Sequence, residues 1–155
     1  EFHSMSKTYN MTGWRLGWVA GQADVVARLS RVKTFLDTGV FKAVQAAGVA
    51  ALDCRNEWVP QNVAVFQARR DAAVAALTTA GFEAVSPKAT MYLWVPVPGG
   101  EPSLEFAERA FSQEGVVVVP GSGLGDGGEG FFRIALTVGA ERLEAAAERL
   151  GRVAR

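Results

Sequence analysis

Lys7, near the start of the chain, lies among residues that together can form a covalent and phosphate-binding site. Ser4 and Ser6 precede it closely, and Arg15 follows a short distance along the chain. A lysine amine that loses its proton can form a Schiff base with an aldehyde. If that aldehyde carries a phosphate, nearby hydroxyl groups and a guanidinium supply the donors and the positive charge it needs. This spacing predicts a site for pyridoxal 5'-phosphate, attached at Lys7 and held by Ser4, Ser6 and Arg15.

The segment from Glu1 to Trp18 resembles the lysine signature of class I/II aminotransferases, which are fold-type I pyridoxal-phosphate enzymes. It is most similar to the signature of LL-diaminopimelate aminotransferases and of relatives assigned to aspartate or alanine. The resemblance implies that Lys7 holds the cofactor and moves the α-proton of the substrate, while Ser4 and Arg15 hold the phosphate. The alternative is a polar surface turn with one exposed lysine, which the agreement over residues 4–17 disfavours.

A second candidate site residue, Arg133, lies in an apolar run near the C-terminal end, between Phe132 and Ile134. An arginine with apolar neighbours on a strand usually has an anionic partner, and its planar fork fits both oxygens of a carboxylate. The resemblance implies that Arg133 binds the α-carboxylate of the substrate. A structural salt bridge to one of the glutamates is the alternative.

The resemblance covers all 155 residues but only the second part of the family pattern. It implies an α/β fold, namely the C-terminal part of a fold-type I enzyme. Residues 1–60 would be the end of the cofactor-binding large domain and residues 61–155 the small domain, with the boundary inside a long connecting helix. The family residues that contact the pyridine ring would precede this chain, so we expect the isolated chain to be inactive.

Composition and charge exclude several other classes of protein. Lysine plus arginine and aspartate plus glutamate both number 16, which gives none of the positive excess that nucleic-acid binding requires. No apolar run is long enough to span a bilayer and the N-terminus is not a signal peptide, so we expect a cytoplasmic protein. Cys54 is expected to be at least partly buried. His3 has no ligand partners at metal-binding spacing, so no metal site is predicted.

Apolar periodicity predicts alternating helices and strands along the chain. Gly81 is expected to end the longest helix, with Pro60 in its first turn and Arg69–Asp71 on a solvated face. Ser103 is expected to cap a helix, and residues 91–94 to belong to the core. The predicted helices are residues 24–36, 40–52, 60–80, 103–111 and 140–153. The predicted strands are residues 16–20, 82–85, 91–95, 116–119 and 131–136.

The glycines of residues 121–130 include the letters of a dinucleotide-binding motif at residues 123–128. That motif requires a helix to follow it, because the helix N-terminus binds the pyrophosphate. Here the following run is strand-like, so we interpret the glycines as a flexible loop beside Arg133.

Three functions remain open at this point. The first is transamination between an amino acid and a 2-oxo acid, with LL-diaminopimelate, aspartate or alanine as the donor. The second is another reaction of the same cofactor and fold, catalysed by a lyase, decarboxylase or acyltransferase. The third is non-enzymatic, either a ligand-sensing domain of a transcription regulator or an inert fragment that folds poorly. The apolar helices of residues 24–52 and the resemblance also imply a homodimer when the protein is full length.

Overall fold

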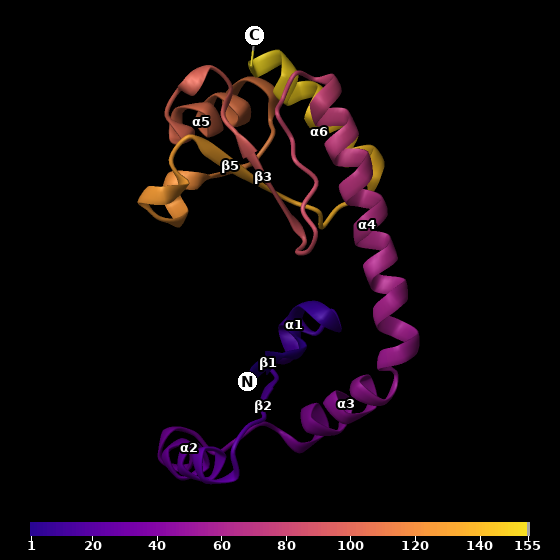
Figure 1. Ribbon diagram of the computed structural model, residues 1–155, viewed down its shortest axis with the longest axis vertical. Coiled ribbons are helices and arrows are strands. Elements are labelled where there is room, and N and C mark those ends of the chain that lie inside the picture. The colour runs from indigo at the N-terminus through magenta and orange to yellow at the C-terminus, as the bar shows by residue number, and fades with distance from the viewer. Residues whose placement is uncertain (155) are drawn as a thin grey trace. The chain divides into compact units, whose positions relative to one another are not determined.

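The computed structural model describes residues 1–154, and these divide into two compact units, residues 1–63 and the described residues from 64 onward. The division falls inside the longest helix, α4 (Arg55–Thr79), which is drawn in magenta in Figure 1. The fold is α/β. The assignment of residues 1–60 to a large domain and of residues 61–155 to a small domain remains a prediction.

The first unit consists of a two-stranded antiparallel ladder, a loop that the ladder closes, and helices. Strand β2 (Gly17–Val19) lies where the sequence predicts one, whereas its partner β1 (Phe2–Ser4) is not predicted. The register pairs Phe2 with Val19 and Ser4 with Gly17. The elements are β1 (Phe2–Ser4), α1 (Met5–Thr8), β2 (Gly17–Val19), α2 (Ala23–Leu36) and α3 (Lys42–Asp53).

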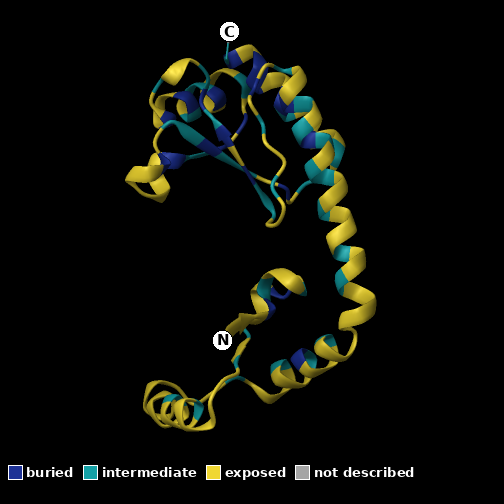
Figure 2. Cartoon of the chain, in the orientation of Figure 1, coloured by how far each residue is buried: buried dark blue, intermediate teal, exposed yellow. Residues whose placement is uncertain are grey.

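Helix α2 agrees with its predicted bounds, yet none of its residues is buried. The side chains of its apolar stripe are largely exposed, with exposed fractions of 56% for Val25, 58% for Val32 and 77% for Leu36. Figure 2 shows α2 almost entirely in the colour of exposed residues. The stripe is therefore an apolar face with no partner among residues 1–154.

The start of α4 differs from the prediction. The helix begins at Arg55, so Pro60 lies inside it rather than in its first turn. The N–H groups of Glu57 and Trp58 donate to the carbonyl oxygen of Cys54 (3.2 and 2.9 Å), and these bonds start the helix before the proline is reached. Pro60 then removes one hydrogen bond from the helix interior. Cys54, expected to be at least partly buried, is exposed.

The end of α4 confirms the role predicted for Gly81. The N–H of Gly81 donates to the carbonyl oxygen of Thr78 (3.1 Å), and the N–H of Phe82 donates to that of Leu77 (3.0 Å). These two bonds form a Schellman motif, which requires the residue after the helix to adopt a positive φ. Gly81 has a φ of 99°.

We expect Gly81→Ala to destabilise the fold by about 1–2 kcal/mol, because a side chain at this φ is strained even where space is free. Gly123→Ala is the matched control, since neither glycine has an atom within 4 Å of an added Cβ and Gly123 has no positive φ. Urea unfolding of the complete polypeptide measures the stability of both variants. Equal midpoints for the two variants would contradict the strain argument.

The second unit is a three-stranded antiparallel sheet packed against helices that include α5 (Ser103–Glu114). The order of its strands is β3 (Tyr92–Pro96), β5 (Phe131–Ala135) and β4 (Val119–Pro120). Side chains on one face are buried, including Leu93, Val95 and Phe132, and they pack with Leu77 of α4 and Phe106 of α5. Figure 2 shows most of the dark blue buried residues in this unit. Its elements are the C-terminal part of α4, β3 (Tyr92–Pro96), α5 (Ser103–Glu114), β4 (Val119–Pro120), β5 (Phe131–Ala135) and α6 (Ala140–Val153).

One predicted strand is absent from the structure, and another is shorter than predicted. Residues 82–85 form no strand, because Phe82 turns into the core (4% exposed) and the chain then leaves it, with Val85 75% exposed. The strand predicted at residues 116–119 is reduced to β4, which pairs with β5 only at Val119 and Pro120. Val116 and Val118 are buried, whereas Val117 is 77% exposed.

Three side-chain predictions also need correction. Arg69 and Arg70 are partly buried rather than solvated, and they donate to the carbonyl oxygens of Leu136 (3.1 Å) and Pro87 (3.3 Å). Of residues 91–94, only Leu93 is buried. Ser103 is the first residue of α5 and Pro102 is its N-cap, so Ser103 does not cap the helix as expected.

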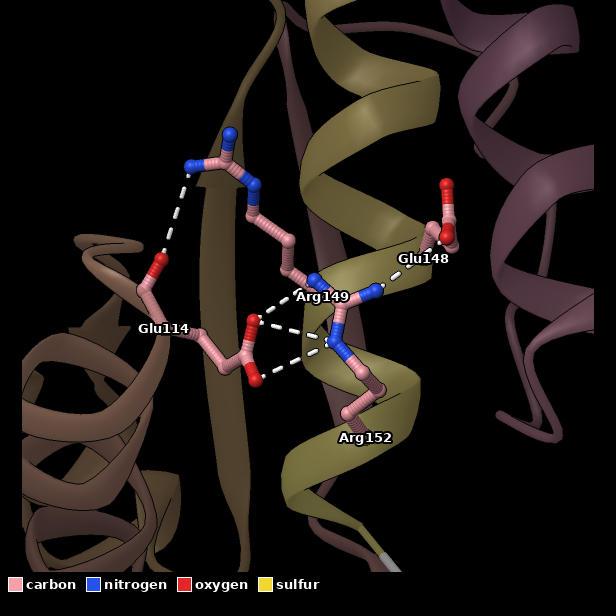
Figure 3. A network of polar contacts seen from close by, with 4 residues as sticks. All are labelled: Glu114, Glu148, Arg149 and Arg152. Carbon is pink, nitrogen blue, oxygen red and sulfur yellow. Dashed lines mark hydrogen bonds and ion pairs between the residues drawn. The ribbon is translucent and has the colours of Figure 1, made fainter.

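A polar network joins the C-terminal end of α5 to α6 (Figure 3). Arg152 lies 2.7 Å from the carboxylate of Glu114 and 3.1 Å from that of Glu148. The hydrogen bond from Arg152 lowers the pKa of Glu114. Because the side chains of Arg152 (46% exposed) and Glu148 (77%) reach solvent, we expect the network to add little to the stability of the fold.

Candidate active site

The backbone around Lys7 forms a closed loop, residues 5–16, at the end of the β1–β2 ladder. The last ladder pair is Ser4 with Gly17, and the N–H of Met5 continues the pairing by donating to the carbonyl oxygen of Leu16 (3.0 Å). Met5 is buried under the loop (1% exposed). A Cβ at Gly17 would lie 2.7 Å from the carbonyl oxygen of His3, so the base of the loop requires glycine there.

Lys7 lies on the single turn of α1, which Ser4 caps. The Oγ of Ser4 accepts a hydrogen bond from the N–H of Ser6 (3.1 Å). Lys7 is exposed, and its amine has no hydrogen-bond or ion-pair partner among residues 1–154. An amine that no carboxylate holds is available for covalent chemistry.

Arg15 is held in an uncommon backbone conformation at the far side of the same loop. Its φ of 52° and ψ of 45° are left-handed, a conformation that non-glycine residues adopt at a cost. One guanidinium N–H donates to the carbonyl oxygen of Thr12 (2.8 Å), and the Thr12 hydroxyl donates to the carbonyl oxygen of Ser6 (3.0 Å). Thr12 therefore links Arg15 to the backbone beside Lys7.

Asn62 of α4 adds a second support for the loop. Its amide nitrogen donates to the carbonyl oxygen of Thr8 (3.4 Å), and its amide oxygen accepts from the side chain of Asn10 (3.3 Å). Asn10, like Arg15, has a positive φ of 53°. The sequence alone predicts no role for Thr12, Asn10 or Asn62. One sequence feature could have identified Asn10, namely that asparagine tolerates a left-handed backbone conformation.

The donor set of the loop fits a phosphate-bearing aldehyde. Lys7 supplies a free amine, Ser4 and Ser6 supply hydroxyl groups, and Arg15 retains guanidinium N–H groups beyond the one that Thr12 uses. All four belong to one loop or its closing pair. The chemistry of these groups therefore agrees with the predicted pyridoxal-phosphate site.

Arg133 lies at the middle of β5, in the second unit, opposite Trp94 on β3 and Val119 on β4. Its guanidinium carbon lies 4.3 Å from the ring centroid of Tyr92. The guanidinium is partly buried and has no hydrogen bond or ion pair within the described part of the chain. The structural salt bridge considered for Arg133 is therefore absent from residues 1–154.

The glycine-rich loop before β5 is anchored at its end by Glu129. Its carboxylate accepts from the backbone N–H of Ser103 (2.7 Å) and of Gly130 (2.8 Å), and the Ser103 hydroxyl donates to it (3.2 Å). The backbones of Gly121 and Gly128 cross so closely that a Cβ at either would clash with the other's carbonyl group. A strand follows this loop, so the dinucleotide motif is excluded by its context, as predicted.

The contacts of Glu129 predict a pH dependence. The backbone hydrogen bonds from Ser103 and Gly130 lower the pKa of Glu129 below its ordinary value of 4.5. Glu129 therefore stabilises the fold above about pH 4.5, and this contribution is lost as the pH falls through the lowered pKa, because the unfolded chain takes up the proton first. In Glu129→Gln that part of the acid dependence should disappear.

The measurement is urea unfolding of the complete polypeptide between pH 3 and 6, roughly the range in which carboxyl groups titrate. Glu83→Gln is the control, because Glu83 is exposed and has no polar partner among residues 1–154. If the two variants lose stability with acid in parallel, Glu129 does not anchor the loop in solution.

His3 has a structural role. Its ring stacks on Trp18 with centroids 4.0 Å apart, and its Nε2 lies 3.0 Å from the carboxylate of Glu1. Within residues 1–154 no group of three or more His, Cys, Asp or Glu side chains lies together as a metal site would require. In the same range, the helices are too short or too polar for a membrane crossing.

Comparison with known proteins shows the family to which the chain belongs. The model of the family "Aminotransferase class I and II" matches residues 2–150. The LL-diaminopimelate aminotransferase of Moorella thermoacetica is 51% identical over 153 residues, which are 99% of this chain and 39% of that protein. The LL-diaminopimelate aminotransferase 2 of Nostoc sp. is 49% identical over 97% of this chain and 38% of its own length. The chain thus spans about two fifths of these relatives.

Solved structures agree with the sequence comparison. A probable N-succinyldiaminopimelate aminotransferase from Thermus thermophilus superposes with a TM-score of 0.91 at 40% identity, covering 99% of this chain and 41% of that one. An aromatic aminotransferase from Pyrococcus horikoshii gives a TM-score of 0.90 at 34% identity, covering 98% and 41%. The chain therefore belongs to the class I and II aminotransferases, a family of pyridoxal-phosphate-dependent enzymes, and matches about two fifths of the length of its members.

Proposed function

We propose that the protein containing this chain catalyses transamination between an amino acid and a 2-oxo acid, with pyridoxal 5'-phosphate as its cofactor. The observation that carries the proposal is the closed loop of residues 5–16, which presents the unpartnered amine of Lys7 together with Ser4, Ser6 and Arg15. Family membership supports it independently.

Each site residue has a distinct role in this proposal. Lys7 binds the cofactor covalently and moves the proton of the substrate α-carbon. Arg15 and the hydroxyl groups of Ser4 and Ser6 hold the phosphate. The bound cofactor supplies an electron sink for the α-carbon. Arg133 binds and orients the substrate α-carboxylate through its guanidinium fork.

LL-diaminopimelate is the favoured amino donor, because relatives that are about half identical to this chain over nearly its whole length carry that name. The solved structures of similar fold carry names that point to different amino acids, so the fold alone does not select the donor. Product analysis with LL-diaminopimelate, aspartate and alanine in turn distinguishes the three. A rate with aspartate or alanine that exceeds the rate with LL-diaminopimelate would overturn the assignment.

The two alternative functions can be distinguished from transamination by their reaction products. A lyase, decarboxylase or acyltransferase would use the same Lys7, Ser4 and Arg15, but would not convert a 2-oxo acid into an amino acid. A ligand-sensing domain of a transcription regulator would bind the cofactor without turnover. The family match favours transamination over both.

We also propose that residues 1–60 are the end of the large domain, that residues 61–155 form the small domain, and that the full-length protein is a homodimer. The dimer is inferred from the family resemblance together with apolar side chains near the end of α2 and the start of α3, including Phe35 (91% exposed), Leu36 (77%) and Phe41 (74%). Exposed apolar clusters of this kind mark interfaces. A full-length protein that sediments as a monomer at micromolar concentration would refute the dimer.

The test of the cofactor site is reductive trapping. The complete polypeptide, loaded with pyridoxal 5'-phosphate, is treated with borohydride, digested and analysed by mass spectrometry. We expect the reduced adduct on the peptide that contains Lys7, and a change in the absorption spectrum when the amino donor is added before reduction. An adduct on any other lysine, with Lys7 unmodified, would overturn the proposal.

A further inference from the structure

The open face of the β3–β5 pair carries aromatic side chains around Arg133. Tyr92 and Trp94 on β3 share this face with Phe131 and Arg133 on β5, because side chains alternate along each strand. The rings of Trp94 and Phe131 stack on each other, with centroids 5.6 Å apart and planes at 17°. Tyr92 instead pairs diagonally with Arg133, whose guanidinium carbon lies 4.3 Å from the ring centroid.

The contact between Tyr92 and Arg133 has a property that an ion pair would lack. A guanidinium that lies over a ring uses its face, and its in-plane N–H groups remain free to donate. A glutamate partner would occupy those same N–H groups and would compete with an incoming carboxylate. Among residues 1–154, Arg133 has no such competitor.

The ring also reduces the cost of binding. A free arginine side chain samples many rotamers, and part of that freedom is lost when it binds a ligand. Tyr92 lies on β3, and Leu93, the next residue of the same strand, is fully packed in the core (1% exposed). The ring of Tyr92 is therefore attached to a rigid element. A guanidinium already held against such a ring loses less freedom when it binds.

We propose that Tyr92 is a positioning residue for Arg133, holding the guanidinium so that its donor edge is open to the carboxylate of the amino acid and of the 2-oxo acid. This inference rests on the proposed function of Arg133. The ring, not the hydroxyl group, carries the effect, because the Tyr92 hydroxyl has no hydrogen bond in the described residues.

The experiment compares Tyr92→Phe with Tyr92→Leu in the full-length, cofactor-loaded protein. We expect Tyr92→Leu to raise the KM for both substrates by about 5-fold, the size typical of a partly desolvated cation–π contact, with kcat nearly unchanged. Tyr92→Phe should behave like the wild type. Phe111→Leu is the matched control, since it removes an exposed ring on α5 that has no cationic partner among residues 1–154. Tyr92→Met provides a second ringless variant if the leucine variant folds poorly.

A binding measurement separates positioning from general damage. The inhibition constant of a simple aliphatic carboxylate should rise in Tyr92→Leu by the same factor as the KM, while that of the corresponding carboxamide should not change. A loss in Tyr92→Phe equal to that in Tyr92→Leu, or no loss in either ringless variant, would overturn the proposal. If Arg133→Ala also leaves the carboxylate inhibition constant unchanged, the role of Arg133 itself is wrong. If only Arg133→Ala raises it, Tyr92 alone is wrongly assigned.

Discussion

Lys7→Ala should lower the transamination rate of the complete polypeptide by about 10³-fold or more, because it removes both the covalent attachment of the cofactor and the group that moves the α-proton. The amine lies on a loop closed by the Ser4–Gly17 pair and has no competing partner in residues 1–154. A methyl group at this position can neither react nor transfer a proton. Single-turnover measurements with the loaded enzyme and amino donor report this loss directly.

Two further variants sharpen the interpretation. Lys7→Arg keeps the positive charge, but a guanidinium stays protonated and cannot act as a base, so its rate should fall as far as that of the alanine variant. Lys88→Ala removes a lysine outside the loop and should leave the rate unchanged. If Lys7→Arg kept a substantial part of the activity, the positive charge of Lys7 and not its reactive amine would be its contribution.

Helices were predicted well because their signal is local. The apolar spacing in residues 140–153 gave the bounds of α6 and its buried side chains, Leu143, Ala147 and Leu150. Gly81 was identified as the end of α4 because positive φ is a property of single residues. The start of α4 differs from the prediction, because a proline favours the first turn of a helix, whereas this helix begins at Arg55 and contains Pro60 in its interior.

Short strands were predicted less well, because a strand exists only where a partner pairs with it. Residues 116–119 are all apolar and residues 82–85 are apolar except for Glu83, yet Phe82, Val116 and Val118 are buried by packing against the core and not by pairing in a ladder. The apolar side chains of these segments indicate that the residues are buried. They do not indicate which other segment of the chain lies beside these residues.

In the candidate site, too, local features could be predicted from the sequence, whereas contacts between distant segments could not. Lys7, Ser4, Ser6, Arg15 and Arg133 were singled out from residue types in a recognisable order, and their roles remain predictions. The supports of these residues were not found from the sequence. Asn62 is far along the chain from the loop it contacts, and Tyr92 reaches Arg133 only through the register of two strands. Contacts between distant segments leave little trace in a single sequence.

The second large effect is expected at Arg133. Arg133→Ala should lower kcat/KM for the amino donor by about 10²- to 10³-fold, because the substrate carboxylate would lose its charged partner. The structure gives a specific reason to expect so large a loss. The guanidinium is partly buried on the open face of the sheet, and no ion pair with residues 1–154 has to be broken before a carboxylate binds.

Arg133→Lys tests whether charge alone suffices. An ammonium offers a point charge instead of a planar fork and stacks less well on Tyr92, so this variant should recover only a small part of the loss. Arg142→Ala is the control, because Arg142 is an exposed arginine of α6 whose side chain makes no polar contact among residues 1–154. Steady-state kinetics with the donor and the 2-oxo acid measure all three. Wild-type kcat/KM in Arg133→Ala would show that the substrate carboxylate is bound elsewhere, and full recovery in Arg133→Lys would show that the fork and its ring contact are unnecessary.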